Sequence, residues 1–563
     1  MTVEVDVPVL IVGAGPVGLM TGLLLDQQGI DYRIVERRPT LHLAPQAHVI
    51  SSRSLEICRS VGIDDETIRR LGPSPADTSS VRWVDRLVGR DLGVFRIGAA
   101  RRTIERMLTQ SPTPTTNLGQ DRFESVLFDH LDRSERVLFS HAWSGYESTD
   151  GGYRSTVELD DGAGAGETVE IRSRHLLGAD GAGSRVRKAL GIDMVGPDNL
   201  QTYLNIHFRA DLRRELTGRE GLLYWVMDDR VSGAFIAHDI ESTWIFMKTV
   251  DDETTLDPID EGHYADLLRL AIGVDVDVDI VSMNPWRMTA QIAERYRNDG
   301  VFLVGDAAHR FPPTGGIGMN TGIQDVHNLV WKLAMVEGGG DPALLDTYEP
   351  ERKPVAETNS SQSLTNATKM FEVAARLDVD GDGTISAADL DAVLGDPERQ
   401  ARVQEAVDGQ AAHFDMSGLD LGFCYPPGPL VLGDGDPPPS DDPVSIYVPS
   451  TTPGARLPHA ALQRNGEWLS TLDLVRHDAF LVLAGSDGTS VEVGGSDVPV
   501  ALAVVGSGSD LTPADDTYDE LFPSDRTLIV RPDGHIAARL PADAPPSTVE
   551  AMLDTLGARW FKR

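Results

Sequence analysis

The chain has 563 residues and a formal net charge of −37, and its balance of 41% hydrophobic and 24% charged residues is that of a globular protein with an ample core. This length predicts two or three domains. The acidity excludes nucleic-acid binding by phosphate neutralisation and docking on an anionic membrane through a basic patch.

The cysteines and the apolar runs set further limits. Cys58 and Cys424 lie far apart and form no CxxC pair, so neither a disulfide framework nor a zinc site is indicated. No apolar run approaches ~18 residues, and the first residues include Glu4 and Asp6 rather than the basic start of a secretion signal. We therefore expect a cytoplasmic protein without a membrane span.

The first motif in chain order is a glycine-rich turn between two apolar segments. Residues 5–12 are almost continuously apolar and predict a buried strand, and residues 32–35 predict a second strand that ends on Glu36. Apolar residues at helical spacing follow the turn, which consists of Gly13, Ala14, Gly15, Pro16, Val17 and Gly18. This order of strand, GxGxxG turn, helix, strand and acid predicts a dinucleotide site.

Each glycine of this turn has a mechanical role. Gly13 allows the tight turn, Gly15 lets the backbone approach a pyrophosphate, and Gly18 lets the helix pack on the sheet. Glu36 is placed to bind a ribose hydroxyl. A glycine turn without a ligand is the alternative, and it leaves Glu36 unexplained.

An acidic turn follows further along the chain. A strand at residues 175–178 leads to Asp180 and Gly181, followed by Ser184 and a helical segment that carries arginines. This turn resembles a second contact point for the ribose and phosphate of a nucleotide. A turn that only caps a helix is the alternative, and by itself it is the better explanation.

A second glycine-rich stretch covers residues 305–322, between an apolar strand at residues 301–304 and a helical pattern at residues 323–334. A strand, a glycine-rich turn and a helix start direct backbone N–H groups at an electron-rich ligand. Asp306, at the strand end, is placed to accept hydrogen bonds from ligand hydroxyls. Two prolines and five glycines predict a rigid loop whose backbone can approach a flat ring.

The middle of the chain changes to alternating patterns. Residues 203–283 predict an antiparallel sheet of several short strands. Because only 6% of the chain is aromatic, a concentration of aromatic residues here favours the wall of an aromatic-binding pocket, with core packing as the alternative; the residues are Tyr224, Trp225, Trp244 and Trp286. Residues 433–453 predict a linker, and the remainder predicts a small α/β domain.

Residues 378–389 match the calcium loop of an EF-hand. Carboxylates stand at the first, third and fifth positions, with glycine at the sixth, an aliphatic residue at the eighth and an acid at the twelfth. Asp389 stands where a bidentate glutamate is usual, and only one such loop is visible. The pattern fits a structural Ca²⁺ site and an acidic surface insertion equally well; the Ca²⁺ ligands would be Asp378, Asp380, Asp382, Thr384 and Asp389.

Taken together, the GAGPVG turn with Glu36, the Asp180 turn and the second glycine stretch resemble the FAD-dependent single-component aromatic hydroxylases related to para-hydroxybenzoate hydroxylase. Within that family, residues 45–50, residues 422–425 and the C-terminal extension look like those of phenol, chlorophenol and aromatic-polyketide hydroxylases. The resemblance implies an α/β fold with a Rossmann-like FAD-binding domain, an antiparallel-sheet substrate domain and a C-terminal thioredoxin-like domain. The absence of a CxxC pair argues against a redox role for that last domain.

The resemblance also implies how the chain is divided. The FAD-binding domain would comprise residues 1–75, 111–190 and 286–430, the last part including the helical region with the calcium-type loop at 378–389. The substrate domain would comprise residues 76–110 and 191–285. Residues 431–450 would form the linker and residues 451–563 the thioredoxin-like domain.

For the cofactor, the resemblance implies extended FAD, with the ribose on Glu36, the pyrophosphate on the Gly13–Gly18 turn and the ribityl chain on Asp306. Backbone N–H groups near Gly318, Met319 and Asn320 would face the flavin pyrimidine edge, where helix N-terminal amides stabilise negative charge. NADPH would bind transiently near residues 180–187, because only one GxGxxG unit is present. The remaining cofactor contacts would be Arg37, Gln46, Gln120, Asp180, Gly305, Pro313 and Gly316.

The implied chemistry is reduction of the flavin by NADPH, formation of a flavin hydroperoxide with O2, and transfer of oxygen to an electron-rich ring. His48 stands near the activating acid of related phenol hydroxylases and would activate the substrate hydroxyl, with a packing histidine as the alternative. Pro312 and Gly315 would shape the wall opposite the flavin. The substrate would contact Tyr224, Trp225, His238 and Trp286.

The leading interpretation is an NADPH-dependent hydroxylase, a monomer or homodimer, that acts on a polycyclic aromatic polyketide. A simple phenol or chlorophenol 2-monooxygenase is the first alternative. A flavin halogenase would carry a Trp-x-Trp-x-Ile-Pro segment, which this chain lacks. A calcium-regulated flavin-binding scaffold is the alternative outside enzymes, and the intact stretch at residues 305–322 argues against it.

Overall fold

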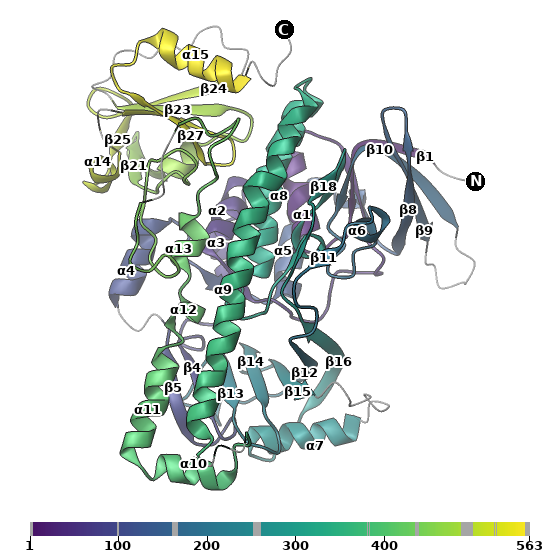
Figure 1. Ribbon diagram of the computed structural model, residues 1–563, viewed down its shortest axis with the longest axis vertical. Coiled ribbons are helices and arrows are strands. Elements are labelled where there is room, and N and C mark those ends of the chain that lie inside the picture. Colours follow the sequence, from purple (N-terminus) through teal and green to yellow (C-terminus); the bar gives the residue numbers. More distant parts are fainter. Residues whose placement is uncertain are drawn as a thin grey trace.

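The structure, a computed structural model, describes residues 4–97, 101–159, 167–250, 261–379, 381, 383–433, 438–485, 499–522, 524 and 526–557, without the side chains of residues 101–105. Three large sheets with helices around them make up the molecule (Figure 1). The predicted mixed α/β fold class is confirmed. No helix within these residues is both long and apolar enough to cross a bilayer.

The first sheet has parallel strands at its centre. Its strands are β1 (Glu4–Val12), β2 (Tyr32–Val35), β7 (Val137–Leu138), β8 (His141–Thr149), β9 (Gly152–Leu159), β10 (Thr168–Gly178), β18 (Arg297–Asn298) and β19 (Val301–Leu303). The order is β18-β19-β10-β1-β2-β7, and β8 and β9 form a hairpin that extends β10. The strands predicted at residues 5–12 and 32–35 are confirmed by β1 and β2.

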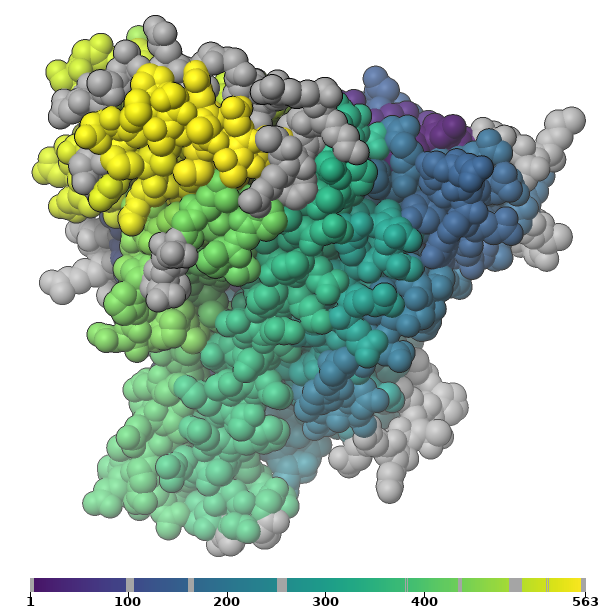
Figure 2. All heavy atoms as spheres, turned by 45° about the horizontal axis from the view of Figure 1, so that its top comes forward, coloured from purple at the N-terminus to yellow at the C-terminus, as the bar shows by residue number. Residues whose placement is uncertain are grey.

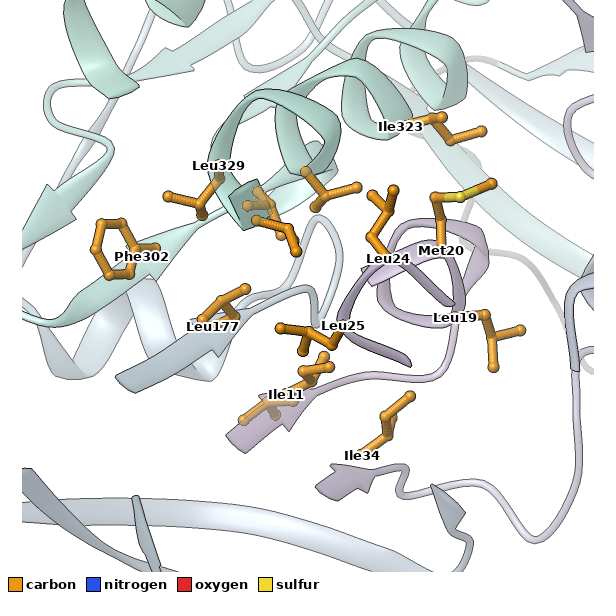
Figure 3. Close-up of a cluster of buried hydrophobic side chains, with 14 of the residues drawn as sticks. Ile11, Leu19, Met20, Leu24, Leu25, Ile34, Leu177, Phe302, Ile323 and Leu329 are labelled. Atoms are coloured by element: carbon orange, nitrogen blue, oxygen red, sulfur yellow. The ribbon is translucent and has the colours of Figure 1, made fainter. Parts of the chain in front are cut away.

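Two helices, α1 (Pro16–Gln27) and α8 (Gly318–Glu337), pack side by side over this sheet. Figure 3 shows side chains from both helices and from β1 and β10 converging in one core, among them Leu24, Ile323, Ile11 and Leu177. Strands buried on both faces are apolar almost continuously, which explains the run in β1. Four shorter helices belong to the same part: α2 (Ser52–Ser60), α3 (Asp65–Leu71), α5 (Gln120–Asp129) and α6 (Arg185–Ala189).

Short strands connect the first sheet to the second. One pair is β3 (Val49–Ile50) with β6 (Thr116–Asn117), and one three-stranded group is β11 (Met194–Val195), β17 (Gln291–Ala293) and β20 (His309–Arg310). The helix α4 (Arg101–Gln110) precedes β6. These strands bring the loops at the ends of the first sheet next to the second sheet.

The second sheet is the predicted antiparallel one. Its strands are β4 (Ser80–Val84), β5 (Asp91–Arg96), β12 (Gln201–Arg209), β13 (Leu223–Val226), β14 (Gly233–Asp239), β15 (Thr243–Val250) and β16 (Asp279–Met288), and α7 (Glu261–Ile272) packs against it. The order is β16-β12-β15-β14-β13-β4-β5; the pairing of β13 with β4 is parallel, and the other pairings among the described strands are antiparallel. On one face, Leu204, Ile206 and Phe208 of β12 pack in the core beneath α7.

The third sheet comprises β21 (Ala461–Arg464), β22 (Glu467–Ser470), β23 (Phe480–Gly485), β24 (Val500–Val505), β25 (Leu511–Pro513), β26 (Arg526–Val530) and β27 (Ile536–Pro541), with the helices α14 (Thr517–Leu521) and α15 (Pro546–Gly557). The strands β23 and β24 are parallel, β26 is antiparallel to β23, and β27 is antiparallel to β26. A parallel pair, an antiparallel pair and a final helix form the arrangement expected of a thioredoxin-like domain.

A helix of 30 residues, α9 (Tyr348–Leu377), runs from the first sheet to the second (Figure 1). The helices α10 (Ala387–Leu394) and α11 (Pro397–Asp408) pack with its end against β4 and β5, and the shared core contains Trp83, Leu92, Val373, Leu390 and Val407. The helices α12 (Ala411–Phe414) and α13 (Ser417–Gly422) lead back toward α2.

Two buried ionic clusters join the third sheet to the rest of the molecule. In the first, Arg531 contacts Glu351 of α9 at 2.7 and 2.8 Å, and Lys332 of α8 donates to the same carboxylate at 2.7 Å. In the second, Arg456 donates to Glu56 of α2 at 2.9 Å. Figure 2 shows the C-terminal part seated directly on the green and teal surface of the chain. Both arginines are 0–1% exposed, so these contacts are part of the folded core.

Candidate functional site

The first glycine turn has the geometry that its motif predicts. Gly13 has a φ of 108°, and a Cβ atom there would lie 2.4 Å from the carbonyl oxygen of Ala179. A Cβ atom at Gly18 would lie 1.9 Å from the carbonyl oxygen of Gly13. At Gly15, by contrast, nothing lies within 4 Å of the added atom. The fold itself therefore requires Gly13 and Gly18, whereas the space at Gly15 suits a ligand that approaches the backbone.

We expect Gly15→Ala to affect cofactor binding and Gly18→Ala to affect folding. Gly15→Ala should fold with an unchanged melting temperature without cofactor but bind the cofactor more weakly, because its methyl group enters only ligand space. Gly18→Ala should not yield folded protein, because its methyl group overlaps the Gly13 carbonyl. Circular dichroism and cofactor titration measure both effects. Equal melting temperatures for the two variants would contradict this division of roles.

Glu36 lies at the end of β2, beside the glycine turn. It is 5% exposed, and its carboxylate accepts a hydrogen bond from the Ala14 N–H at 2.9 Å and from the Arg38 side chain at 3.0 Å. Burial raises the pKa of Glu36, but these hydrogen bonds outweigh it, so the net shift is downward. The charged carboxylate thus fixes the turn. Arg37, predicted to contact the nucleotide, is exposed, and that role stays a prediction; the sequence analysis did not predict Arg38, whose side chain holds Glu36.

Asp306 lies at the end of β19, in the turn Gly305–Ala307. Its side chain is exposed to solvent, yet surrounding protein raises the pKa of its carboxyl by desolvation, while His309 and Arg310 oppose the shift. Within the described part of the chain, no donor forms a hydrogen bond with this carboxylate. It is therefore placed to accept hydrogen bonds from a ligand, unlike the carboxylates of Glu36 and Asp180.

A buried triad beneath Asp306 fixes the shape of this loop. His309 and Asp325 are 0% exposed and lie 2.7 Å apart from Nε2 to Oδ2, and Arg352 donates to the other carboxylate oxygen at 2.8 Å. The Gly305 N–H also reaches Asp325, at 3.3 Å. The positive neighbours outweigh burial and lower the pKa of Asp325, so the triad is ionic. The sequence analysis missed this triad because Asp325 and Arg352 sit on separate helices.

The helix α8 begins directly after the second glycine loop. Its N-cap, Ile317, provides no side-chain cap, and neither does Gly15 at the start of α1. The first N–H groups of both helices are therefore available to negatively charged or electron-rich ligand atoms. At α8 these groups belong to Gly318, Met319 and Asn320.

Asn320 connects this loop to the segment after His48. Its side chain donates to the Val49 carbonyl at 3.0 Å and accepts from the Ser51 N–H at 2.9 Å. A Cβ atom at Gly316 would lie 2.8 Å from that of Val49. His48 is thereby held close to the loop at the start of α8.

The Asp180 carboxylate is used inside the protein. It accepts hydrogen bonds from Ser184 Oγ at 2.5 Å, from the Arg185 N–H at 2.6 Å and from the Val186 N–H at 3.1 Å, which caps α6. The helix-capping alternative of the sequence analysis thus describes this side chain. Arg187 donates to the Ala307 carbonyl at 3.2 Å, so α6 is attached to the Asp306 turn.

The residues around His48 come from two different sheets. His48 Nδ1 lies 3.0 Å from the Asn117 amide oxygen, and its ring meets that of His238 of β14 edge-on, with 5.6 Å between centroids. His238 is 8% exposed, and in the part of the chain that the structure describes its Nε2 has no hydrogen-bond partner. Burial lowers the pKa of His48 and, with His48, His207 and Arg122 nearby, lowers that of His238 further, so both rings are neutral at pH 7.

Comparison with known proteins identifies the ligand that this geometry serves. Residues 6–363 match the family described as FAD binding domain, and residues 450–563 match the one described as aromatic-ring hydroxylase, C-terminal. The chain belongs to the FAD-dependent aromatic hydroxylases. The family resemblance drawn from the sequence is confirmed.

Individual relatives match this hydroxylase along its whole length. A tetracenomycin B2 monooxygenase-dioxygenase of Streptomyces olivaceus is 33% identical, covering 100% of this chain and 99% of that protein. A 2,4-dichlorophenol 6-monooxygenase of Cupriavidus pinatubonensis is 31% identical, covering 99% and 97%. The crystal structure of the flavin-dependent monooxygenase PieE with FAD and substrate has a TM-score of 0.89 at 28% identity, covering 99% of both chains. That of aklavinone-11 hydroxylase with FAD and aklavinone has a TM-score of 0.77 at 28% identity, covering 98% and 99%.

The residues of the hydroxylase fit FAD. The open space at Gly15 and the uncapped start of α1 suit the pyrophosphate. The carboxylate of Asp306, which no described residue contacts by a hydrogen bond, suits the ribityl hydroxyls. The uncapped start of α8 suits the electron-rich edge of the flavin ring. These assignments of single residues remain predictions of the sequence analysis.

Other predicted cofactor residues lie around these three points. Gln120 begins α5, and its side chain contacts Glu124 at 2.9 Å, while Gln46 is exposed and contacts His42. Pro312 is buried and Pro313 is exposed. Gly315, with a φ of 113°, packs against Met416, so the wall predicted there touches the segment before α13.

The predicted substrate residues divide between the two faces of the second sheet. Tyr224 is 0% exposed, packs beneath α7 with Trp244, and donates to the Arg219 carbonyl. Its ring belongs to the core, because neighbouring residues of a strand point to opposite faces. Trp225 points to the face that carries His238, and Trp286 stacks on Tyr203 with 5.6 Å between centroids. The aromatic cluster expected as one wall is therefore divided, and Tyr224 has no place in such a wall.

The calcium-type loop lies between α9 and α10, at the edge of the second sheet. Asp380 and Asp382 lie outside the described residues. The Asp378 carboxylate accepts from the N–H groups of Gly381 and Gly383 at 2.7 and 2.9 Å, and that of Asp389 forms a capping box with Ser386 at the start of α10. Among the described residues, no group of acidic, histidine or cysteine side chains forms a metal site. Calcium binding, with Thr384 as a further ligand, stays a prediction.

Proposed function

We propose that this hydroxylase inserts one oxygen atom of O2 into a polycyclic aromatic polyketide, with NADPH as the reductant. The observation that carries the proposal is the face of the second sheet that bears His238, which we call the His238 face. It comprises Tyr203, Asn205, His207, Leu223, Trp225, Ala234, Ile236, His238, Ile245, Met247 and Trp286. A wide apolar surface with a few spaced polar groups is typical of a binding site for a large flat ligand.

The relatives support this choice of substrate. Two of those reported above are named for tetracenomycin B2 and aklavinone, and all of them are oxygenases, which favours hydroxylation over halogenation. A simple phenol or chlorophenol is the second candidate, and the 2,4-dichlorophenol relative favours it. The breadth of the His238 face, which crosses five strands, favours the larger substrate. We place the enzyme in the cytoplasm as a monomer or homodimer.

FAD, when bound, takes electrons from NADPH and activates O2. The chain has to bind and orient both partners, exclude water and move one proton. The second sheet holds the aromatic ring, and the loop before α8 holds the flavin. NADPH would approach along residues 180–187, where Arg187 lies beside the Asp306 turn.

His48 is placed to take the proton of the substrate hydroxyl. An amide oxygen only accepts hydrogen bonds, so the contact with Asn117 Oδ1 assigns the proton of neutral His48 to Nδ1. The lone pair at Nε2 is then available as a base. Loss of the phenolic proton raises the electron density of the ring, which is what electrophilic oxygen transfer requires.

Replacing His48 with alanine should lower the rate of hydroxylation by about 100-fold, within the usual contribution of a general base, and change flavin reduction little. Because burial lowers the pKa of His48, the wild-type rate should be full at neutral pH and fall only when the pH drops below the ordinary range of a histidine. Stopped-flow absorbance separates the two steps. His130→Ala, at the end of α5, is the matched control. Equal effects of His48→Ala on both steps would remove His48 as a base.

The function itself is tested by anaerobic reduction of the bound FAD by NADPH, with phenols and polycyclic hydroxyaromatics added one at a time. We expect reduction to accelerate with a polycyclic compound and product analysis to show one added oxygen atom. Equal reduction rates with and without every aromatic compound would overturn the proposal.

A further inference from the structure

The His238 face carries polar atoms that the protein leaves without partners. Asn205 Oδ1 and His207 Nδ1 of β12, Trp225 Nε1 of β13 and His238 Nε2 of β14 are all buried, and no group among the described residues forms a hydrogen bond with them. His207 and His238 are 7% and 8% exposed. A buried polar atom without a partner costs roughly 1–3 kcal/mol, so four on one face need a physical reason.

The strand register fixes where these atoms lie. Asn205 is in line with Met247, Ala234 and Trp225 across four strands, and His207 is in line with Ile245, Ile236 and Leu223. Directly paired residues of antiparallel strands point to the same face, so both rows belong to the His238 face. Each row has a polar group at the β12 end and apolar side chains along its middle.

The spacing between the two histidines is set by the sheet. The strand β15 lies between β12 and β14, and His238 lies two residues beyond Ile236, which is level with His207, so the backbones of the two histidines are more than about 10 Å apart. That distance exceeds the separation of two oxygens on one benzene ring. Oxygens on different rings of a fused planar system can reach it.

The electrostatics of the two histidines agree with a neutral, polar ligand. Burial lowers the pKa of His207, with Arg209 acting in the same direction and Asp121 against it. The ring is neutral at pH 7, so it can donate to a carbonyl or accept from a hydroxyl. An aromatic compound with phenol and ketone oxygens offers both groups.

We propose that His207 and His238 bind oxygens on two different rings of the substrate, which makes His207 a specificity-determining residue for polyoxygenated fused-ring aromatics. This inference rests on the proposed function, because it describes the same site. The apolar side chains of the two rows accept the ring faces, and the two separated histidines select molecules that carry a second oxygen.

The test measures the binding affinity of the oxidised holoenzyme for three probes, from the change in flavin absorbance as each probe is added. Phenol has one ring and one oxygen, anthrol has three fused rings and one oxygen, and emodin is a trihydroxylated anthraquinone. We expect His207→Leu to weaken emodin binding about tenfold, as loss of one buried hydrogen bond does, and to change anthrol and phenol binding less than twofold.

Two further variants keep the result interpretable. His207→Asn retains a polar atom at the position of Nδ1 and should restore most of the affinity for emodin. His413→Leu makes the same replacement at another buried histidine, on α12, whose Nδ1 has no hydrogen-bond partner among the described residues, and it should leave all three affinities unchanged. An equal loss for all three probes in His207→Leu, or no loss for emodin, overturns the inference.

Failure of the role proposed for His207 can be distinguished from failure of the proposed function. If emodin binds with the expected dependence on His207 but neither accelerates flavin reduction nor gains oxygen, the proposed function fails and the binding role of His207 stands. If the wild-type enzyme binds emodin no more tightly than phenol, the role of His207 fails, whatever the enzyme does with other substrates.

Discussion

Replacement of Asp306 by alanine is expected to lower the affinity for FAD by about 10- to 100-fold, the range expected when hydrogen bonds to a charged group are lost. The carboxylate has no hydrogen-bonding partner in the described part of the protein, and it is accessible from the Gly305–Ala307 turn. The variant should fold normally, since the ionic triad beneath it, with Asp325 at its centre, is untouched. Flavin fluorescence during titration of the apoprotein measures the affinity.

Two companion variants identify the cause of that loss. Asp306→Asn keeps an acceptor oxygen but removes the charge, so its affinity should lie between those of the wild type and Asp306→Ala. Asp346→Ala removes an exposed aspartate that pairs with Arg297 away from the site, and it should bind FAD normally. Full flavin occupancy of Asp306→Ala at low FAD concentration would refute the assigned role.

The second large effect is expected for Arg531→Met. Removal of one partner from a buried ionic cluster typically costs about 3–5 kcal/mol, because the opposite charges stay buried without compensation. Arg531 neutralises Glu351 and Asp533, which lie at 2.7 and 2.6 Å and are themselves buried. Thermal denaturation should show the thioredoxin-like domain separating or unfolding at a lower temperature than in the wild type.

The pH dependence of the same contact has a definite sign. Burial raises the pKa of Glu351, but Arg531 and Lys332 outweigh burial and lower it to about 2. Its contribution to stability is therefore present above the ordinary glutamate pKa and is lost as the pH falls from there toward 2. Arg476→Met breaks an exposed pair with Asp478 in the same domain and should change stability by at most about 1 kcal/mol. A similar small effect for Arg531→Met would show that the cluster does not hold the domain in place.

Individual strands and turns could be predicted from the sequence because short-range residue patterns determine them. The run at residues 5–12 and the glycines of the first turn follow from what a buried parallel strand and a helix start require. The sheet beginning at β12 follows from alternation, and that same alternation places Tyr203, Asn205 and His207 on one face and Leu204, Ile206 and Phe208 on the other. Applied to residues 223–226, it would also have separated Tyr224 from Trp225.

The contacts that complete the site could not be read in this way. Asn117 reaches His48 across 69 residues, and Asp325 reaches Arg352 from a neighbouring helix. Neither pair has a fixed spacing, because tertiary packing alone brings the residues together. The sequence also gave no signal that Arg531 would be fully buried, since arginine is usually exposed unless it is paired.

The 30-residue helix α9 also limits how the enzyme can move. A helix of this length spans about 45 Å, and its internal proline, Pro354, lies near its start, before the contacts described next. Near the middle of α9, the Thr314 hydroxyl of the glycine-rich loop before α8 donates to the Ser363 carbonyl at 2.6 Å, and at the C-terminal end Val373 and Leu377 lie in the core against β4 and β5. The loop before α8 and the second sheet, which together form the proposed active site, are thus both attached to α9. We therefore expect admission of substrate and release of product to come from displacement of side chains, loops or the flavin itself, with little change in the distance between the two sheets.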